Sequence, residues 1–221
     1  MYIEYQCYDK VLLSDVKKDL FKAIDCGVDG ISVPVPYISK IKGFIPEDVI
    51  ISCPVDYPNG FSDTDLRIHY AMKAVHCGAT AIDLVANTFL YYHEKKEFVN
   101  DLKSIHNLCT DKGIKLRVMV NHKSLTHNED YMPMLREINS FKGIEYVFCS
   151  TGLFSEDPID NILLSRIAQE HFGFKAISNG NFYLPKHLNR VAQAKIFGVR
   201  FNNCRALKRC ISVYNNLEDQ D

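Results

Sequence analysis

The sequence predicts an α/β protein of the (β/α)8 or TIM-barrel class, in which eight parallel strands are surrounded by an outer layer of helices. The first observation is that eight short apolar runs alternate with amphipathic helical patterns along the chain. The second is that these runs are apolar on both faces, as parallel strands covered by helices are. The alternative is an open doubly wound sheet, but neither a G-x-G-x-x-G motif nor a P-loop follows the first run.

The strands are predicted from short runs of apolar and β-branched residues that end at glycine, proline or polar residues. Pro36 follows the second run, and a turn by composition, 56–60, follows the third. The predicted strands are 2–7, 29–34, 49–55, 81–86, 115–121, 146–150, 174–178 and 199–202.

The helices between these strands are bounded by residues with known terminal preferences. Ser14 and Ser62 are predicted N-caps, Pro158 starts a helix, and Gly78 and Gly173 follow helix ends. The predicted helices are 15–24, 37–43, 62–77, 97–112, 130–141, 158–172, 185–197 and 205–217.

The composition of the chain limits the classes of protein to which it can belong. The chain has 221 residues and no linker rich in Pro, Gly or Ser, which predicts one domain over 1–221. The formal net charge of -1 gives no field to recruit nucleic acid or a membrane, and we find neither a signal peptide nor an apolar run of membrane-spanning length. Since the eight cysteines include no C-x-x-C pair, we expect buried free thiols in a reducing cytoplasm, with no metal site and no cofactor.

Polar residues near the predicted strand ends are the candidate site, because the chemistry of such barrels lies where strands end and loops begin. Alternation places Arg117 and Asn121 on one face of their strand. Asp83 and Lys175 each lie inside an apolar run and must be paired, since an isolated buried charge is costly. The candidates are Glu4, Asp56, Asp83, Asn87, Arg117, Asn121, Ser150, Thr151, Lys175, Ser178, Asn179, Asn202 and Asn203.

Two similar turns follow neighbouring strands, Ser-Thr-Gly at 150–152 and Ser-Asn-Gly at 178–180. Their backbone N–H groups and hydroxyls can bind a phosphate or carboxylate. The alternative is ordinary turn chemistry. The occurrence of two such turns on adjacent strands favours the anion site.

Several segments, in strand order and over nearly the whole chain, resemble the deoxyribose-phosphate aldolase family of class I aldolase barrels. Residues 77–87 resemble its fourth strand, Gly-Ala-(Asp)-Glu-Ile-Asp-Met-Val-Ile-Asn, and residues 146–152 its sixth, Phe-Val-Lys-Thr-Ser-Thr-Gly. Residues 174–180 resemble its seventh, Val-Lys-Ala-Ser-Gly-Gly. Shorter matches are Ile3-Glu4, 55–60 and 115–121. The resemblance implies a (β/α)8 barrel and reversible carbon–carbon cleavage of a substrate such as 2-deoxyribose 5-phosphate.

The resemblance also implies roles for individual residues. In that family a sixth-strand lysine forms a Schiff base with the aldehyde, and a seventh-strand lysine beside it lowers its pKa. A fourth-strand carboxylate and a fifth-strand basic residue help to move protons. Asp83, Arg117 and Lys175 stand at the fourth-, fifth- and seventh-strand positions, and Glu4 at a first-strand aspartate. Phe148 stands where the Schiff-base lysine is expected.

Phe148 cannot act as a nucleophile, so amine chemistry would have to move to another side chain. Lys175 is the candidate, predicted to be buried at the barrel mouth beside Arg117 with a lowered pKa. The alternative is that Lys175 only forms a structural ion pair with Asp83. The leading hypothesis is an aldolase-like lyase in which Lys175 forms the Schiff base, Asp83 transfers protons, Arg117 tunes the pKa or contacts an anion, and Glu4 orients water.

The second hypothesis is a non-catalytic or repurposed barrel that binds a sugar phosphate or a protein partner, and the third is a related reaction without a Schiff base. Each allows assembly into a homo-oligomer. The predicted substrate-binding residues are Asn87, Asn121, Ser150, Thr151, Gly152, Ser178, Asn179, Gly180, Asn202 and Asn203.

Overall fold

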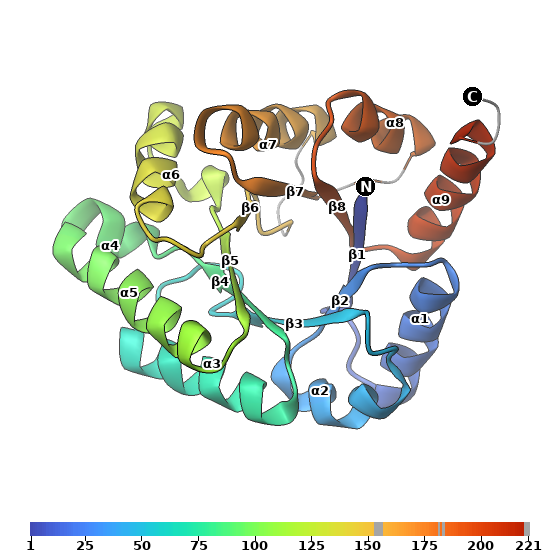
Figure 1. The fold of residues 1–221 in the computed structure, drawn as a ribbon, viewed down its shortest axis with the longest axis horizontal. Helices are drawn as coiled ribbons and strands as arrows, with labels where there is room; N and C mark the ends of the chain where they lie inside the picture. Colours follow the sequence, from blue (N-terminus) through green and yellow to red (C-terminus); the bar gives the residue numbers. More distant parts are fainter. Residues whose placement is uncertain (153–156, 181, 183, 219–221) are drawn as a thin grey trace.

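The computed structural model describes residues 1–152, 157–180, 182 and 184–218. Within them, eight parallel strands pair in sequence order and close into a barrel, because β1 pairs with both β2 and β8 (Figure 1). The predicted (β/α)8 fold is confirmed. The strands are β1 (Tyr2–Gln6), β2 (Gly30–Ser32), β3 (Ile50–Val55), β4 (Ala81–Val85), β5 (Lys115–Met119), β6 (Tyr146–Phe148), β7 (Lys175–Asn179) and β8 (Gly198–Phe201).

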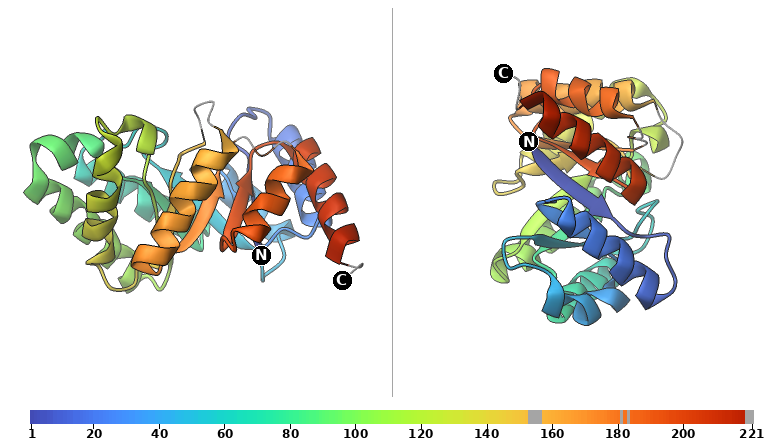
Figure 2. Two further views of the ribbon diagram at one scale, coloured as in Figure 1. Left: turned by 90° about the horizontal axis from the view of Figure 1, so that it is seen from above. Right: turned by 90° about the vertical axis from the view of Figure 1, so that its right-hand side faces the viewer.

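Helices form the outer layer, and α9 packs beside α1 where the barrel closes (Figure 2). The described residues also form short 3-10 helices at Lys42–Phe44, His122–Ser124 and Asn128–Asp130. The α-helices are α1 (Leu13–Asp25), α2 (Val35–Ile41), α3 (Thr64–Cys77), α4 (Thr88–His93), α5 (Lys95–Asp111), α6 (Tyr131–Asn139), α7 (Pro158–Phe172), α8 (Pro185–Gln193) and α9 (Cys204–Glu218).

Two predicted N-caps are wrong. Helix α1 begins at Leu13, so Ser14 lies inside its first turn. Helix α3 begins at Thr64, and Ser62 instead donates its backbone N–H and its hydroxyl to the Asp56 carboxylate, each over 2.8 Å. The Asp56 carboxylate, directly after β3, therefore binds Ser62 in place of the N-terminus of α3.

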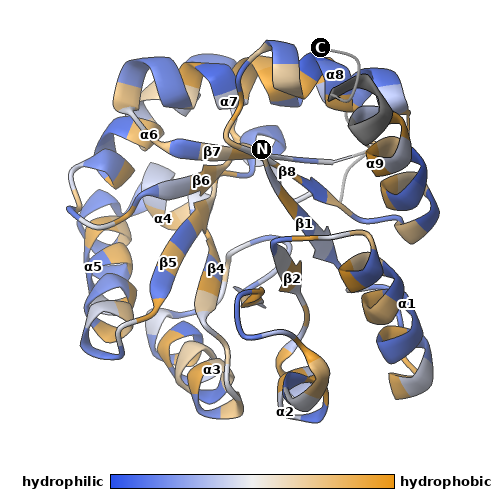
Figure 3. Cartoon of the chain, turned by 45° about the vertical axis from the view of Figure 1, so that its right-hand side comes forward, coloured by the Kyte–Doolittle hydropathy of each residue, from blue (hydrophilic) through white to orange (hydrophobic). Residues whose placement is uncertain are grey.

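The main hydrophobic core lies between the sheet and the helices. The outer helices carry hydrophobic and hydrophilic residues side by side, which lets one face of each helix pack on the barrel (Figure 3). A second, smaller apolar cluster lies inside the barrel and contains Val85, Met119, Phe148 and Ile177. These four residues come from β4 to β7 and occupy matching positions of the parallel register. The interior of the barrel is therefore apolar only on that side.

Candidate functional site

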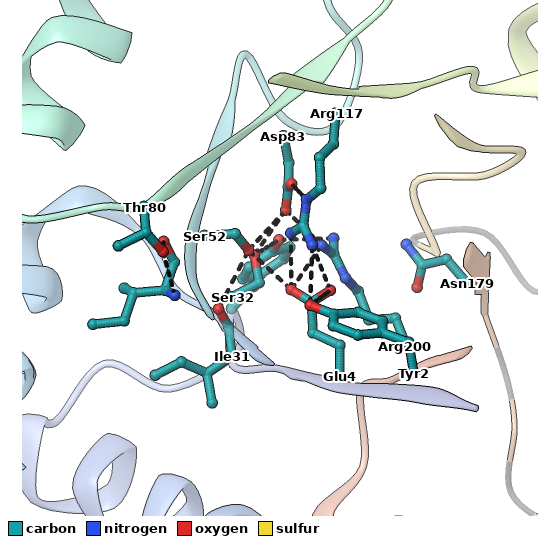
Figure 4. A network of polar contacts seen from close by, with 12 residues as sticks. Tyr2, Glu4, Ile31, Ser32, Ser52, Thr80, Asp83, Arg117, Asn179 and Arg200 are labelled. Carbon is teal, nitrogen blue, oxygen red and sulfur yellow. Dashed lines mark hydrogen bonds and ion pairs between the residues drawn. The ribbon is translucent and has the colours of Figure 1, made fainter. Parts of the chain in front are cut away.

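Four charged side chains meet inside the barrel and form what we call the charged quartet: Glu4 on β1, Asp83 on β4, Arg117 on β5 and Arg200 on β8 (Figure 4). Arg117 donates from Nε to Asp83 Oδ1 over 2.6 Å, and from Nη2 to Glu4 Oε1 over 2.9 Å. Arg200 Nη2 lies 3.0 Å from Glu4 Oε1 and 2.5 Å from Asp83 Oδ2. Each residue is at most 1% exposed, so the quartet is shielded from water.

Hydroxyl groups extend the quartet toward β2, β3 and the loop after β1. Ser52 Oγ lies 2.9 Å from Glu4 Oε1 and 3.0 Å from Asp83 Oδ2, and Ser32 Oγ lies 3.1 Å from the same Asp83 oxygen. The Tyr8 hydroxyl is 2.6 Å from Ser32 Oγ. Asp83 is thereby connected through Ser32 to Tyr8, a side chain that lines the barrel mouth.

The electrostatic balance keeps Asp83, Arg117 and Arg200 ionised. Burial alone would raise the pKa of Asp83, but the guanidiniums of Arg117 and Arg200 lower that pKa below its ordinary value. Burial would lower the pKa of each arginine, but the carboxylates of Asp83 and Glu4 raise both pKa values above the ordinary arginine range. Two carboxylates face two guanidiniums, so the formal charges cancel. Asp83 therefore remains a carboxylate near neutral pH, paired with arginines.

Phe148 covers the guanidiniums from the side of the apolar cluster. Its ring centroid lies 4.1 Å from Arg200 Cζ and 5.2 Å from Arg117 Cζ. A cation over an aromatic face is attracted by the ring quadrupole, more strongly when both are removed from water. The side chain at the position where the resemblance expects a Schiff-base lysine is thus fully buried and packed on two arginines.

Lys175 does not lie at the barrel mouth, and the prediction that it is buried beside Arg117 is wrong. It is the first residue of β7, at the end of the barrel opposite the mouth, and its side chain is 47% exposed. Its amine donates to Glu145 Oε2 over 2.9 Å, and this hydrogen bond raises the pKa of Lys175 instead of lowering it. The alternative that Lys175 pairs with Asp83 is also wrong, because Asp83 pairs with Arg117 and Arg200.

The parallel register explains the error. The residue of β7 that pairs with Phe148 is Ile177, whereas Lys175 pairs with Tyr146. The family segment Lys-Ala-Ser-Gly-Gly has its last glycine four residues after the lysine, but here Gly180 follows Lys175 by five residues. Lys175 and Ile177 are two residues apart and therefore share a face of β7, with Lys175 nearer the N-terminal end of the strand. The neighbour of Phe148 is therefore an apolar side chain.

The C-terminal ends of the strands surround a hollow of about 460 Å³. Three predicted binding residues line it, namely Gly152, Asn202 and Asn203. Among the described residues, its remaining lining consists of Gln6, Tyr8, Asp9 and Tyr57.

The other predicted binding residues are buried near the ends of their strands. Ser150 Oγ accepts from the Gly152 N–H over 2.8 Å, which is ordinary turn chemistry for that hydroxyl. Asn87 caps α4, since its Oδ1 accepts from the Leu90 N–H over 3.0 Å. The remaining predicted binding residues are also buried, namely Asn121, Thr151, Ser178, Asn179 and Gly180.

Several buried polar atoms in this region have no hydrogen-bond partner within the described part of the chain. They include Gln6 Oε1, Asn121 Oδ1, Asn179 Oδ1 and Arg200 Nε. Most buried polar groups in proteins are paired, so such a set near a hollow indicates a place for a ligand or ordered water.

Sequence reasoning missed Arg200, Gln6 and Tyr8. Arg200 lies inside a predicted apolar strand, so the rule that selected Asp83 and Lys175 would also have selected it. Gln6 shares a face with Glu4 by alternation on β1. The sequence gives no comparable signal for Tyr8, which lies beyond the strand.

Among the described residues, no group of three or more His, Cys, Asp or Glu side chains is placed to hold a metal ion. Within the same part of the chain, no helix has both the length and the apolar character needed to cross a bilayer.

The chain is similar in sequence to proteins named deoxyribose-phosphate aldolase. The one from Metamycoplasma arthritidis is 26% identical over 166 residues, covering 73% of this chain and 75% of the relative. The one from Clostridioides difficile is 23% identical over 208 residues, covering 88% of each chain. No family model matches the chain.

Solved structures show the same fold. An aldolase designated QR15 superposes with a TM-score of 0.84 at 16% identity, covering 100% of this chain and 97% of that one. The deoxyribose-phosphate aldolase of Aeropyrum pernix, described as tetrameric, superposes with a TM-score of 0.82 at 17% identity, covering 97% and 90%. The fold is that of an aldolase-type (β/α)8 barrel. In sequence as well as in fold, the chain resembles deoxyribose-phosphate aldolases.

Proposed function

We propose that this protein is a repurposed aldolase-like barrel that binds a small carbohydrate, a sugar or a sugar phosphate, at its C-terminal mouth and performs no Schiff-base chemistry. The names of its relatives support the carbohydrate, because deoxyribose-phosphate aldolase is named for a sugar phosphate. The position of the mouth also supports the proposal, since active sites of (β/α)8 barrels lie at this face.

One observation carries the proposal. All lysines of the chain are among the described residues, and none of them is buried. A Schiff base requires an amine that can lose its proton. The basic groups inside the barrel are those of Arg117 and Arg200, and guanidinium groups stay protonated and are not amine nucleophiles. Phe148 and Ile177 fill the adjoining positions on β6 and β7.

Borohydride trapping tests this proposal. The purified protein is incubated with 2-deoxyribose 5-phosphate and sodium borohydride, and its mass is measured, while release of glyceraldehyde 3-phosphate is measured in a parallel reaction without borohydride. We expect neither an adduct nor the product. An adduct on any lysine, together with release of glyceraldehyde 3-phosphate, would show that Schiff-base cleavage survives.

An aldolase-like lyase acting on 2-deoxyribose 5-phosphate is the second candidate, and the sequence similarity favours it. If that reaction proceeds without a Schiff base, the product forms while no adduct is trapped. The two measurements therefore separate the candidates.

We also infer the cellular compartment and the oligomeric state of the protein. Within the described residues no disulfide links any of the eight cysteines, which supports a reducing compartment such as the cytoplasm. The Aeropyrum pernix relative is described as tetrameric, and we expect this chain to self-associate as well. Light scattering coupled to gel filtration measures its mass in solution. A monomer mass at micromolar concentration would contradict that expectation.

A further inference from the structure

We propose that the base of the mouth recognises the hydroxyl groups of an uncharged polyol or free sugar, and that it does not select for a phosphate group. This inference rests on the proposed function, because it names the chemical class of the ligand bound at the same mouth. Three features carry it: buried acceptors without donors, an adjacent buried donor without an acceptor, and the charge of the lining.

Two acceptors lie at or beside the hollow. Gln6 lines the hollow, is 5% exposed, and its Oε1 has no hydrogen-bond partner in the described structure. Asn179 is fully buried, and its Oδ1 is also without a partner there. That oxygen lies against Gly152, another lining residue, since a Cβ built on Gly152 would come within 2.7 Å of it. Leaving buried acceptors unpaired costs stability, so a ligand that donates hydrogen bonds to them is favoured.

A buried donor lies on the strand beside Asn179. Arg200 Nε is buried without a partner in the same part of the chain, although the other nitrogens of its guanidinium are bound within the quartet or near Tyr8. Arg200 is the register partner of Asn179 on the neighbouring strand, and the Asn179 side chain extends toward the side of the barrel on which Arg200 lies (Figure 4). A hydroxyl both donates and accepts, so it can donate to Asn179 Oδ1 and accept from Arg200 Nε.

The charge of the mouth disfavours a phosphate. Its described lining includes one carboxylate, Asp9, and neither lysine nor arginine. Lys10 is close in sequence, but its amine is paired with Asp9 over 2.8 Å. The positive charge of Arg200 is balanced within the quartet by Glu4 and Asp83. A phosphate dianion would therefore meet a carboxylate at the rim and no unpaired cation among these residues, whereas tight phosphate sites use charged donors.

Aromatic side chains complete a site suited to a sugar. Tyr8 and Tyr57 both line the hollow, and their rings contact each other edge to face with centroids 4.8 Å apart. Small-molecule sites in proteins combine apolar and aromatic surface with a few placed polar groups. The C–H faces of a sugar ring would pack on these rings while its hydroxyls reach the amides below.

Calorimetric titration with matched pairs of sugars tests the inference. The probes are D-ribose and D-ribose 5-phosphate, and 2-deoxy-D-ribose and 2-deoxy-D-ribose 5-phosphate, at one ionic strength and with inorganic phosphate as competitor. We expect at least one free sugar to bind as tightly as its phosphate ester or more tightly, and we expect inorganic phosphate not to compete.

Two substitutions link the binding to the named acceptors. Gln6→Met and Asn179→Leu remove the amide at nearly constant size, and each should weaken binding of the free sugar roughly tenfold, the effect of one lost hydrogen bond. Asn100→Leu is the matched control, because Asn100 lies on the outer helix α5 and contacts Glu97. It should leave affinity unchanged. Circular dichroism measures whether each variant folds. If the Asn179 variant does not fold, the Gln6 variant alone tests the inference, because its substitution lies at the mouth.

The outcomes separate the two proposals. If the phosphate ester binds tenfold more tightly than its free sugar, or inorganic phosphate competes, the hydroxyl inference is wrong while carbohydrate binding at the mouth stands. If none of the four sugars binds, both proposals are wrong. If the free sugar binds but the Gln6 variant binds it equally well, the assignment of the acceptors is wrong.

Discussion

Replacing Asp83 with asparagine tests whether the charged quartet holds the barrel together. The change keeps the size of the side chain but removes one of the two negative charges, so Arg117 and Arg200 would share only the Glu4 carboxylate. Removing one partner of a buried ion pair costs about 3–5 kcal/mol, because the other charge stays buried without compensation. For a chain of this size, about 1 kcal/mol corresponds to roughly 2–4 °C in Tm, so we expect Tm to fall by about 6–20 °C.

Urea and thermal unfolding followed by circular dichroism measure the effect. Asp111→Asn is the control, because Asp111 is an exposed residue at the end of α5, and we expect its unfolding to match the wild type. A loss below about 1 kcal/mol in Asp83→Asn would refute the reasoning, since such a value is typical of exposed ion pairs and not of buried ones.

The pH dependence gives an independent measure of the same contact. The folded pKa of Asp83 lies below its ordinary value, which is about 3.9 in an unfolded chain. The stability it contributes is therefore complete above the unfolded pKa and is lost as the pH falls through the lower, folded pKa. We expect the wild type to lose more stability on acidification below about pH 4 than Asp83→Asn does. Equal losses in both proteins would show that Asp83 is not the responsible group.

Three further substitutions test the placement of Lys175, Phe148 and Gly152. Lys175→Met should leave Tm and sugar binding unchanged, because its amine contacts an exposed carboxylate; a loss of binding measured by calorimetry would contradict its placement. Phe148→Lys should cost about 3–5 kcal/mol through lost packing. The new amine would lie near two guanidiniums that lower its pKa, so we expect a borohydride-trapped adduct with 2-deoxyribose 5-phosphate, and its absence would show that the remaining site is not competent. Gly152→Ala should cost roughly 1–2 kcal/mol, since Gly152 has φ +74° and the new Cβ would meet Asn179. Unchanged urea unfolding would argue against that contact.

The architecture was predictable from the sequence because its signals are local. Each predicted apolar run contains one strand and each predicted helix is present, although the unpredicted helix α4 also lies between β4 and α5, and the register brought Glu4, Asp83 and Arg117 together. What local patterns do not specify is where a strand starts relative to its neighbour. Lys175 lies in an apolar stretch like that around Asp83, but it is the first residue of β7 and faces solvent.

The partners of the predicted residues were harder to foresee, because pairing is a property of the closed barrel. Asp83 was expected to need a cation. The structure provides two, Arg117 on β5 and Arg200 on β8, and both strands are distant from Asp83 in sequence. The predicted cap at Ser62 is wrong for a similar reason, since Ser62 is bound by Asp56 in the folded loop. Strand alternation is fixed by the backbone, whereas the choice among competing polar partners depends on contacts that form only after the strands are in register.

An arginine, and not a lysine, at position 117 of the fifth strand fits the proposal that the buried acids take part in no amine chemistry. A lysine amine is a compact charge that loses its proton readily when buried, but the planar guanidinium of Arg117 binds Asp83 through one nitrogen and Glu4 through two others at once. Arg200 repeats this bridging from β8. Both acids are then bound by permanent cations, and the pKa of Asp83 is lowered, not raised toward neutrality. The quartet occupies the interior of the barrel, and the buried polar atoms without a partner in the described part of the chain include Gln6 Oε1, Asn179 Oδ1 and Arg200 Nε, which the proposed ligand would contact.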